Sequence, residues 1–334
     1  MPPVTDLFDR PLRDLRISVT DRCNFRCTYC MPKEVFGPGY EFLPRDQLLT
    51  FEEITAIVRQ FTDRGVSKVR ITGGEPLLRK GIEDLIGMIA GIDEVTDLTL
   101  TTNASLLARK AKTLARAGLN RVTVSLDAMD DETFESMNDV GFPVSTVLEA
   151  IEIAAEAGLG PIKVNAVIKR GVNEHAVLDM ARHFRGTPHI VRFIEYMDVG
   201  NTNGWRLDDV VPAEKMIENV NSEFPLEPIP PNYPGEVASR FRYLDSEGEI
   251  GVIASVTRPF CGSCTRARVS AEGSLYTCLF ASTGISLRDV IRSGGDLGQA
   301  IDDVWTKRDD RYSEIRSSNT ARLSVPVEMS YIGG

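Results

Sequence analysis

The feature that most constrains the fold of this chain is a series of short strand-like segments in which only alternate residues are apolar. Six such segments lie in the first two thirds of the chain, at residues 15–20, 67–72, 97–102, 121–126, 162–168 and 190–196. Helix-like segments separate them, and Gly65, Gly118 and Gly158 each end a helix shortly before the next strand. Regular alternation of strands and helices predicts a parallel α/β sheet.

The two faces of these strands differ in chemistry. One face is apolar, as Leu15, Ile17 and Val19 illustrate. The other face carries Arg16, Ser18, Lys68, Arg70, Thr72, Thr99, Thr101, Thr123, Ser125, Lys163, Asn165 and Arg192. Parallel strands covered on both faces are nearly all apolar, so we expect the polar face to line a wet cavity. The pattern therefore predicts a partial (β/α)6 barrel of the TIM type that holds a ligand, and an open sheet with one solvated face is the alternative.

The last third of the chain has a different organisation. Four prolines between residues 227 and 235 indicate a linker or a long crossing loop. We therefore divide the chain into a barrel core, residues 1–226, and a smaller C-terminal region, residues 227–334. Two hairpins are predicted in that region, 240–244 with 249–253 and 265–270 with 274–278. If Ser270 pairs with Ser274, the antiparallel register places Cys278 opposite Arg266 and next to Cys264.

All six cysteines of the chain fall into two groups of three. The first group, Cys23, Cys27 and Cys30, has the spacing C-x3-C-x2-C and directly follows a strand. The second group is Cys261, Cys264 and Cys278. Three thiolates can bind three irons of a 4Fe–4S cube and leave the fourth iron open, so we predict two such clusters and an oxygen-sensitive protein. Structural zinc, which usually takes four ligands, and disulfides, which are typical of small secreted domains, are the alternatives.

The net charge of −10 argues against binding to nucleic acid or to an anionic membrane, because both need a basic surface. This charge still allows one small polyanionic ligand in a local cationic pocket. The chain opens without a secretory signal pattern, and it has no apolar run long enough to span a bilayer. We therefore expect a cytoplasmic protein.

A glycine-rich segment follows the second predicted strand, next to the strand that precedes the first thiol group. Gly73-Gly74-Glu75-Pro76 follows the second strand, where paired glycines allow backbone to approach a ligand and Glu75 can accept an ammonium group. Together, C-x3-C-x2-C and Gly-Gly-Glu-Pro resemble the radical S-adenosylmethionine superfamily. The resemblance implies that the open iron binds the methionine part of S-adenosylmethionine, and that one-electron reduction yields a 5′-deoxyadenosyl radical.

The second thiol group indicates one particular family within this superfamily. Several parts of the chain are similar to the GTP 3′,8-cyclases of molybdenum cofactor biosynthesis. They are Cys261, Cys264 and Cys278 with Arg266 and Arg268, the segments 162–165 and 192–200, and the terminal residues 330–334. The similarity extends over nearly the whole chain. It implies a lyase in which the radical takes hydrogen from C3′ of GTP and C3′ then attacks C8 of the guanine. The product is (8S)-3′,8-cyclo-7,8-dihydroguanosine 5′-triphosphate.

The resemblance also implies roles for individual residues. Cys23, Cys27 and Cys30 hold the cluster that cleaves S-adenosylmethionine, and Tyr29, Gly74, Glu75, Ser125 and Met197 contact that cosubstrate. Cys261, Cys264 and Cys278 hold a second cluster whose open iron binds the guanine. The residues that bind GTP are Arg16, Lys68, Arg70, Thr101, Lys163, Arg192, Arg266, Ala267 and Arg268. The tail residues Gly333 and Gly334 reach the active site, and no side chain is assigned as an acid or base.

Partners follow from the same resemblance. Cyclic pyranopterin monophosphate synthase would use the product, and a reductant such as flavodoxin or ferredoxin would supply electrons. The oligomeric state is open, with a homodimer as one alternative. Two other functions compete with the cyclase: a peptide-modifying maturase of the same superfamily with an auxiliary cluster, and a non-enzymatic zinc or iron–sulfur module. The cationic strand face disfavours a purely structural role.

Overall fold

The strands of this chain join one continuous sheet. A computed structural model describes residues 3–316 and 326–333. Its strands are β1 (Asp14–Ser18), β2 (Lys68–Thr72), β3 (Asp97–Thr102), β4 (Arg121–Ser125), β5 (Lys163–Ile168), β6 (Ile190–Glu195), β7 (Leu226–Ile229), β8 (Ser239–Tyr243), β9 (Glu249–Ile253), β10 (Arg266–Val269), β11 (Ser274–Tyr276) and β12 (Ile285–Ser286). They lie in the order β12-β11-β10-β1-β2-β3-β4-β5-β6-β9-β8-β7.

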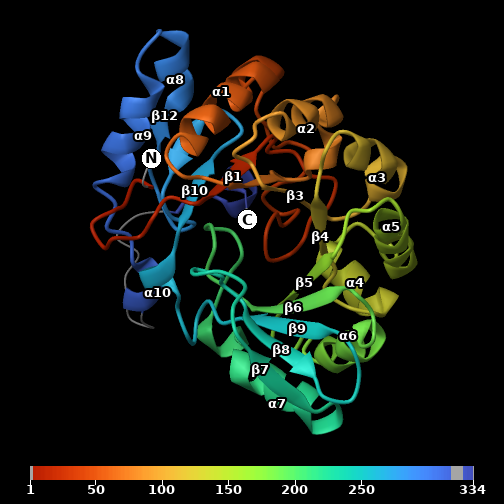
Figure 1. Cartoon of the computed structure of the whole chain (residues 1–334). Helices are drawn as coiled ribbons and strands as arrows, with labels where there is room; N and C mark the ends of the chain where they lie inside the picture. Colours follow the sequence, from red (N-terminus) through yellow and green to blue (C-terminus); the bar gives the residue numbers. More distant parts are fainter. Residues whose placement is uncertain (1–2, 317–325, 334) are drawn as a thin grey trace.

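Most of the helices cover the outer side of this sheet, which curves into an arc around a central space (Figure 1). The helices are α1 (Phe51–Thr62), α2 (Ile82–Ala90), α3 (Leu107–Arg116), α4 (Asp131–Asn138), α5 (Val144–Glu156), α6 (Ala176–Phe184), α7 (Ala213–Glu223), α8 (Leu287–Arg292), α9 (Leu297–Trp305), α10 (Tyr312–Ile315) and α11 (Met329–Ile332). No helix within the described residues is both long enough and apolar enough to cross a membrane.

The prediction of a partial barrel is confirmed, and its six predicted strands are β1 to β6. These strands are parallel, neighbour to neighbour. The sequence did not predict that β10 adds in parallel beside β1 and β9 in parallel beside β6. Strands of the C-terminal part of the chain therefore extend the barrel wall at both ends.

One expectation for the C-terminal part is wrong. Residues 226–229, expected within or beside a proline-rich linker, form strand β7, which pairs antiparallel with β8. β7 is an edge strand, and Pro228 is tolerated there because an edge position can do without one backbone donor. The predicted hairpins are confirmed: β8 pairs with β9, and β10 pairs with β11 with Arg268 opposite Tyr276. Ser270 N donates to Ser274 O at 2.9 Å, which is the predicted register.

The core lies between the apolar face of the arc and the helices. Ile17, Ile71 and Val124 are fully buried on that face, as are Ile57 and Phe61 of α1. A capping box at Thr50 and Glu53 begins α1. Because the helices fill the outer face, the polar strand residues point to the inner side of the arc.

Candidate active site

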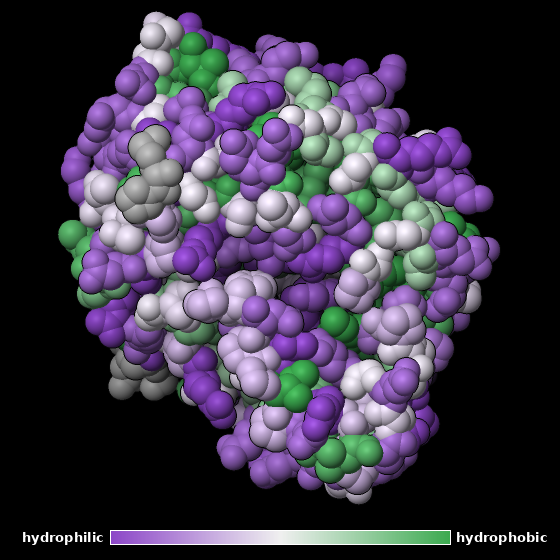
Figure 2. All heavy atoms as spheres, viewed as in Figure 1, coloured by the Kyte–Doolittle hydropathy of each residue, from purple (hydrophilic) through white to green (hydrophobic). Residues whose placement is uncertain are grey.

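A cavity of about 310 Å³ lies on the polar side of the strands. Hydrophilic side chains surround the hollow in the middle of this face of the molecule (Figure 2). All six cysteines line this one cavity, although the two groups are separated by more than two hundred residues in the sequence. The parallel β1–β10 pair explains this, because it places the loop after β1 and the residues before and after the β10–β11 hairpin around the same space.

The first thiol group follows β1 at the carboxyl end of the barrel strands, where α/β barrels place their sites. Backbone contacts shape this loop, since Cys30 N donates to Cys27 O at 2.9 Å. Cys23 Sγ accepts from Phe25 N at 3.4 Å and lies 3.8 Å from Asn103 Nδ2. Burial, together with the charge of Glu75, raises the pKa of the Cys23 thiol to about 11. Thiolates in this loop therefore need a nearby positive charge, such as that of a metal.

The second thiol group lies in a more cationic setting. Arg266 Nη2 donates to Cys264 Sγ at 3.1 Å. Burial alone would raise the pKa of Cys264, but the guanidinium groups of Arg266 and Arg308 outweigh it and lower the pKa to about 6. Burial raises the pKa of Cys278 to about 11. The two groups thus differ in electrostatics. The charge of Glu75 disfavours the thiolate of Cys23 in the first group, whereas the charges of Arg266 and Arg308 favour the thiolate of Cys264 in the second.

The donor sets fit iron–sulfur clusters in kind and place. All six cysteines are free, and each group presents three thiols to the cavity. Within the described residues, no three histidine, cysteine, aspartate or glutamate side chains are arranged to hold one metal ion as they stand. The cysteines of a cluster are spaced more widely than the ligands of a single ion, because each binds its own iron.

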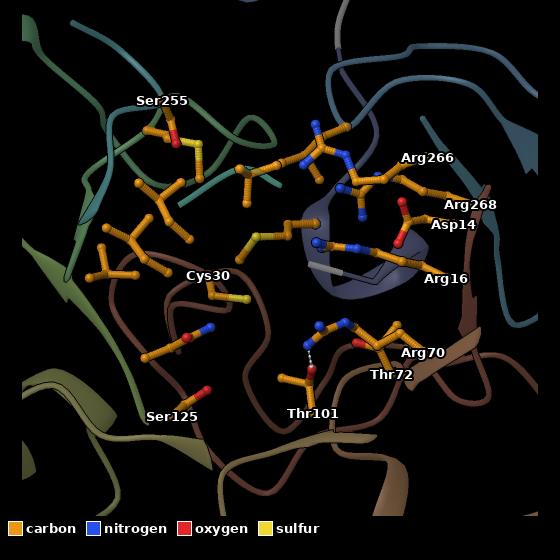
Figure 3. Close-up of a pocket in the computed structure, with 18 of the residues that line it drawn as sticks. Asp14, Arg16, Cys30, Arg70, Thr72, Thr101, Ser125, Ser255, Arg266 and Arg268 are labelled. Atoms are coloured by element: carbon orange, nitrogen blue, oxygen red, sulfur yellow. Dashed lines mark hydrogen bonds between the residues drawn. The ribbon is translucent and has the colours of Figure 1, made fainter. Parts of the chain in front are cut away.

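Four arginines point into the cavity from β1, β2 and β10 (Figure 3): Arg16, Arg70, Arg266 and Arg268. Arg70 Nη1 donates to Thr101 Oγ1 at 3.0 Å and to Thr123 Oγ1 at 3.1 Å. Burial, and then the charges of Arg268, Arg70 and Arg266, lower the pKa of Arg16. Burial and Arg266 likewise lower the pKa of Arg268. These cations repel one another inside an acidic protein, so a polyanion in the cavity would stabilise them.

The remaining residues predicted to bind GTP are placed less uniformly. Lys68 and Arg192 line the cavity, whereas Lys163 and Ala267 are buried beside it and are not part of its lining. Lys68 Nζ donates to Tyr233 Oη at 2.7 Å, and Arg192 Nε donates to Asn165 Oδ1 at 2.9 Å. Burial, followed by the charges of Arg192, Arg121 and Lys68, lowers the pKa of Lys163 to about 7. Lys163 therefore lies on the same inner face of the sheet as Asn165 and Arg192, close to these cations, without lining the cavity.

Four of the five residues predicted to contact S-adenosylmethionine, namely Tyr29, Gly74, Ser125 and Met197, line the cavity. Glu75 is completely buried and does not line it. Its carboxylate accepts from Leu77 N, Thr102 Oγ1 and Asn103 N at 2.8 to 3.0 Å. Glu75 thus joins the loop after β2 to the loop after β3.

The C-terminal tail enters the cavity region from α11. Met329 and Ser330 line the cavity, and the carbonyl oxygen of Gly333 accepts a hydrogen bond from Arg268 Nη1. Gly333 also lies directly against Thr72 of β2. The described tail residues, 326–333, lie inside the arc of strands in Figure 1. Gly334 lies outside the described residues.

Several cavity residues were not identified from the sequence. Asn103 is the first residue after β3 and Asp127 is the second after β4. Their position at the carboxyl ends of barrel strands would have indicated them. Tyr29 Oη donates to Asp127 Oδ2 at 2.9 Å, and burial raises the pKa of Asp127 to about 6. Tyr233 and Glu236 also line the cavity. They lie in the proline-rich stretch and its continuation, where no local sequence pattern indicates a site.

Comparisons with known proteins cover the whole chain. Residues 17–184 match the Radical SAM superfamily, and residues 189–314 match the family described as Molybdenum Cofactor Synthesis C. The chain is 54% identical to a GTP 3′,8-cyclase of Acidothermus cellulolyticus over 99% of both chains. It is 47% identical to a GTP 3′,8-cyclase of Staphylococcus epidermidis, again over 99% of both chains. For a GTP 3′,8-cyclase of Xanthomonas campestris pv. campestris the identity is 49%, over 99% of this chain and 98% of the relative.

Solved structures support the fold. SuiB of Streptococcus suis, crystallised with S-adenosylmethionine, superimposes with a TM-score of 0.63 at 17% identity, covering 92% of this chain and 68% of SuiB. SuiB bound to its precursor peptide SuiA gives a TM-score of 0.65 at 16% identity, covering 92% of this chain and 67% of SuiB. At this level of identity the similarity concerns the fold alone.

Proposed function

The chain belongs to the GTP 3′,8-cyclases, the radical S-adenosylmethionine lyases of molybdenum cofactor biosynthesis, and we propose that its cavity brings two 4Fe–4S clusters, S-adenosylmethionine and GTP together. The observation that carries this proposal is that all six cysteines line the same cavity as the arginine cluster. A cosubstrate held at one group of thiols and a nucleotide held at the other would therefore share one enclosed space.

Cys23, Cys27 and Cys30 would hold the cluster that binds S-adenosylmethionine. When bound there, a reduced cluster would provide the electron needed for cleavage of the sulfonium bond of the cosubstrate. Tyr29, Gly74, Ser125 and Met197 surround the cavity beside these thiols and would orient the cosubstrate. Glu75 would not contact the cosubstrate. It would position the loop that carries Gly74 through its three hydrogen bonds.

GTP would lie among the cations that line or adjoin the cavity. Arg16, Arg70, Arg266 and Arg268 supply four guanidinium groups, and such groups bind phosphate oxygens in a forked geometry. Lys68, Thr101, Lys163 and Arg192 would complete the site, and Ala267 would contribute through its backbone. Mutual repulsion in the empty pocket favours a polyanion over a neutral ligand.

Cys261, Cys264 and Cys278 would hold the second cluster, with its open iron toward the guanine. This assignment places the C-terminal residues 227–334 in the role of an auxiliary-cluster and substrate region, and residues 1–226 in the role of the barrel core. The product would pass to cyclic pyranopterin monophosphate synthase, with flavodoxin or ferredoxin as the electron source. A cytoplasmic location completes the proposal, and the oligomeric state stays open, with a homodimer as one alternative.

The test is anaerobic reconstitution followed by reaction with dithionite, S-adenosylmethionine and GTP. We expect about eight irons per chain with matching sulfide, 5′-deoxyadenosine, and the 3′,8-cyclised nucleotide. Replacing Cys261, Cys264 and Cys278 with alanine should halve the iron content, preserve cleavage of S-adenosylmethionine and abolish cyclisation. Only about four irons in the unmodified protein, or cyclisation by the triple variant, would refute the two-cluster assignment.

A further inference from the structure

A buried group of three charged side chains lies behind the second thiol group. Arg10 Nε is 2.6 Å from Asp6 Oδ2, and Arg308 Nη1 is 3.0 Å from the same oxygen. The side chains of Asp6, Arg10 and Arg308 are at most 2% exposed. One carboxylate therefore bridges two arginines that come from opposite ends of the chain.

Both arginines also bind the loop that carries the thiols. Arg10 Nη1 donates to Cys261 O at 2.8 Å, and Arg308 Nη1 donates to Cys264 O at 2.8 Å. Arg10 Nη1 makes a further hydrogen bond to Asp310 O at 2.8 Å. The backbone at two of the three cysteines of the second group is thus fixed by one buried ionic network.

The N-terminal segment is folded to present Asp6 to this network. Asp6 Oδ1 accepts from Phe8 N at 2.9 Å and from Arg10 N at 3.0 Å. Leu7 N donates to Arg308 O at 3.3 Å, and Trp305 Nε1 donates to Arg10 O at 3.3 Å. These contacts attach the segment before β1 to the end of α9.

The network carries an excess of positive charge. Two guanidinium groups face one fully buried carboxylate, and Arg10 Nη2 is buried without a hydrogen-bond partner among the described residues. Asp310 Oδ2 lies 3.3 Å from Arg308 Nε and is 28% exposed, so it offsets part of the charge of Arg308. Arg10 is left with Asp6 as its one carboxylate partner within the described part of the chain. Burying unbalanced charge costs several kcal/mol of folding free energy. A neighbouring anionic group would offset that cost, and a thiolate-bound iron–sulfur cube is such a group.

We propose that Asp6, Arg10 and Arg308 are positioning residues for the second cluster: they fix the Cys261–Cys264 loop, and their net positive charge raises the reduction potential of the cluster. This inference rests on the proposed second cluster. A positive charge stabilises the reduced cube, which is the more negative form, and cluster potentials depend on local charge and hydrogen bonds. Removing Arg308 should therefore lower the potential, and neutralising Asp6 should raise it.

The test uses the full chain with Cys23, Cys27 and Cys30 replaced by alanine, so that only the second cluster is observed. Its potential is measured by an anaerobic titration followed by electron paramagnetic resonance, in Arg308→Met, Arg308→Lys and Asp6→Asn. Asp9→Asn removes an exposed carboxylate from the same segment, and Lys307→Met removes an exposed cation next to Arg308, so both serve as matched controls.

We expect Arg308→Met to shift the potential down, Asp6→Asn to shift it up, and Arg308→Lys and both controls to stay near the parent value. Loss of the second cluster from Arg308→Met alone, with Arg308→Lys retaining it, also supports the proposal, since it shows that this cation holds the loop. Shifts in the same direction for Arg308→Met and Asp6→Asn, or shifts no larger than those of the controls, would overturn it. A parent protein without any cluster would instead refute the proposed function.

Discussion

At the scale of single residues, the cavity is characterised by buried arginines that lie close enough to lower one another's pKa. Arg16 opens into the cavity from β1, and the charges of three other arginines act on it. The sequence predicted this cluster because side chains alternate strictly along a strand, so Arg16, Arg70 and Arg192 had to share one face. It could not predict that Lys163, on the same face, would not line the cavity, since that depends on how neighbouring side chains fill the space.

Replacing Arg16 with methionine should weaken GTP binding about 10- to 100-fold, because a hydrogen bond to a charged group contributes about 1.5–3 kcal/mol. Binding of S-adenosylmethionine and the iron content should not change. Arg13→Met is the matched control, since Arg13 is exposed and precedes the same strand. Anaerobic calorimetry with GTP measures the effect. Equal affinities for the Arg16 and Arg13 variants would exclude Arg16 from the nucleotide site.

The lowered pKa of Lys163 predicts a proton linkage. Burial and neighbouring cations lower the pKa of this amine to about 7, so near pH 7.5 a substantial fraction of it is neutral in the free protein. The phosphates of GTP favour the charged form and raise the pKa, so binding should take up a fraction of a proton.

Calorimetry in buffers of different ionisation enthalpy counts the protons exchanged. Protonation changes of GTP itself are common to all variants, so the informative quantity is the difference between wild type and Lys163→Met. We expect wild type to take up more protons than Lys163→Met, while Lys112→Met, which removes an exposed lysine of α3, behaves as wild type. Identical proton counts in all three proteins would show that Lys163 does not respond to the nucleotide.

At the scale of elements, two loops at the carboxyl ends of β1 and β2 are packed against each other through backbone. Gly74 N donates to Thr20 O and Glu75 N donates to Arg22 O, both at 2.8 Å. A Cβ atom on Gly74 would collide with the carbonyl group of Arg22, the residue before Cys23. The glycine pair in the sequence predicted a close approach at this position, but only the fold identifies the thiol loop as the segment approached.

Gly74→Ala should therefore displace the first thiol loop and lower the occupancy of the first cluster severalfold, leaving the second cluster in place. Gly87→Ala is the contrasting variant: Gly87 lies within α2, and its nearest non-local atom, Ala117 O, would be 3.9 Å from the new Cβ. Alanine in a helix interior should raise stability by about 0.5–1 kcal/mol without loss of iron. Iron and sulfide analysis with thermal unfolding measures both. Full occupancy of the first cluster in Gly74→Ala would contradict the contact.

At the scale of the whole molecule, segments near both ends of the chain pack around the site that the barrel strands form. The six strands β1 to β6 could be predicted, because each carries its own alternation and is bounded by turn residues. The addition of β9 and β10 at the two ends could not, since nothing in an isolated hairpin specifies the strand it will join. The same limit applies to Asp6 and Arg308, which meet only after the N-terminal segment reaches α9.

The C-terminal tail allows a test of whether the end of the chain contributes to the site. Glu328 Oε1 accepts from Asn201 N at 2.9 Å, and Val327 N donates to Ala281 O at 3.0 Å, so the tail is anchored before it reaches Arg268. Removing Gly333 and Gly334 leaves both anchors and both thiol groups intact. We expect that truncation to preserve the iron content and the cleavage of S-adenosylmethionine, and to abolish formation of the cyclised nucleotide.

A single substitution at Gly333 distinguishes loss of the hydrogen bond between Gly333 and Arg268 from a general effect of backbone strain. Gly333→Ala places a methyl group against Thr72 at a φ of 76°, whereas Gly294→Ala has a similar φ of 72° with open space around the new atom. Both variants carry a backbone cost of about 1–2 kcal/mol, but only Gly333→Ala should displace the carbonyl group that Arg268 binds. Product analysis should thus show cyclisation reduced at least tenfold in Gly333→Ala and retained in Gly294→Ala. Undiminished cyclisation by the truncated protein, or equal losses in the two alanine variants, would mean that the tail does not act at the site.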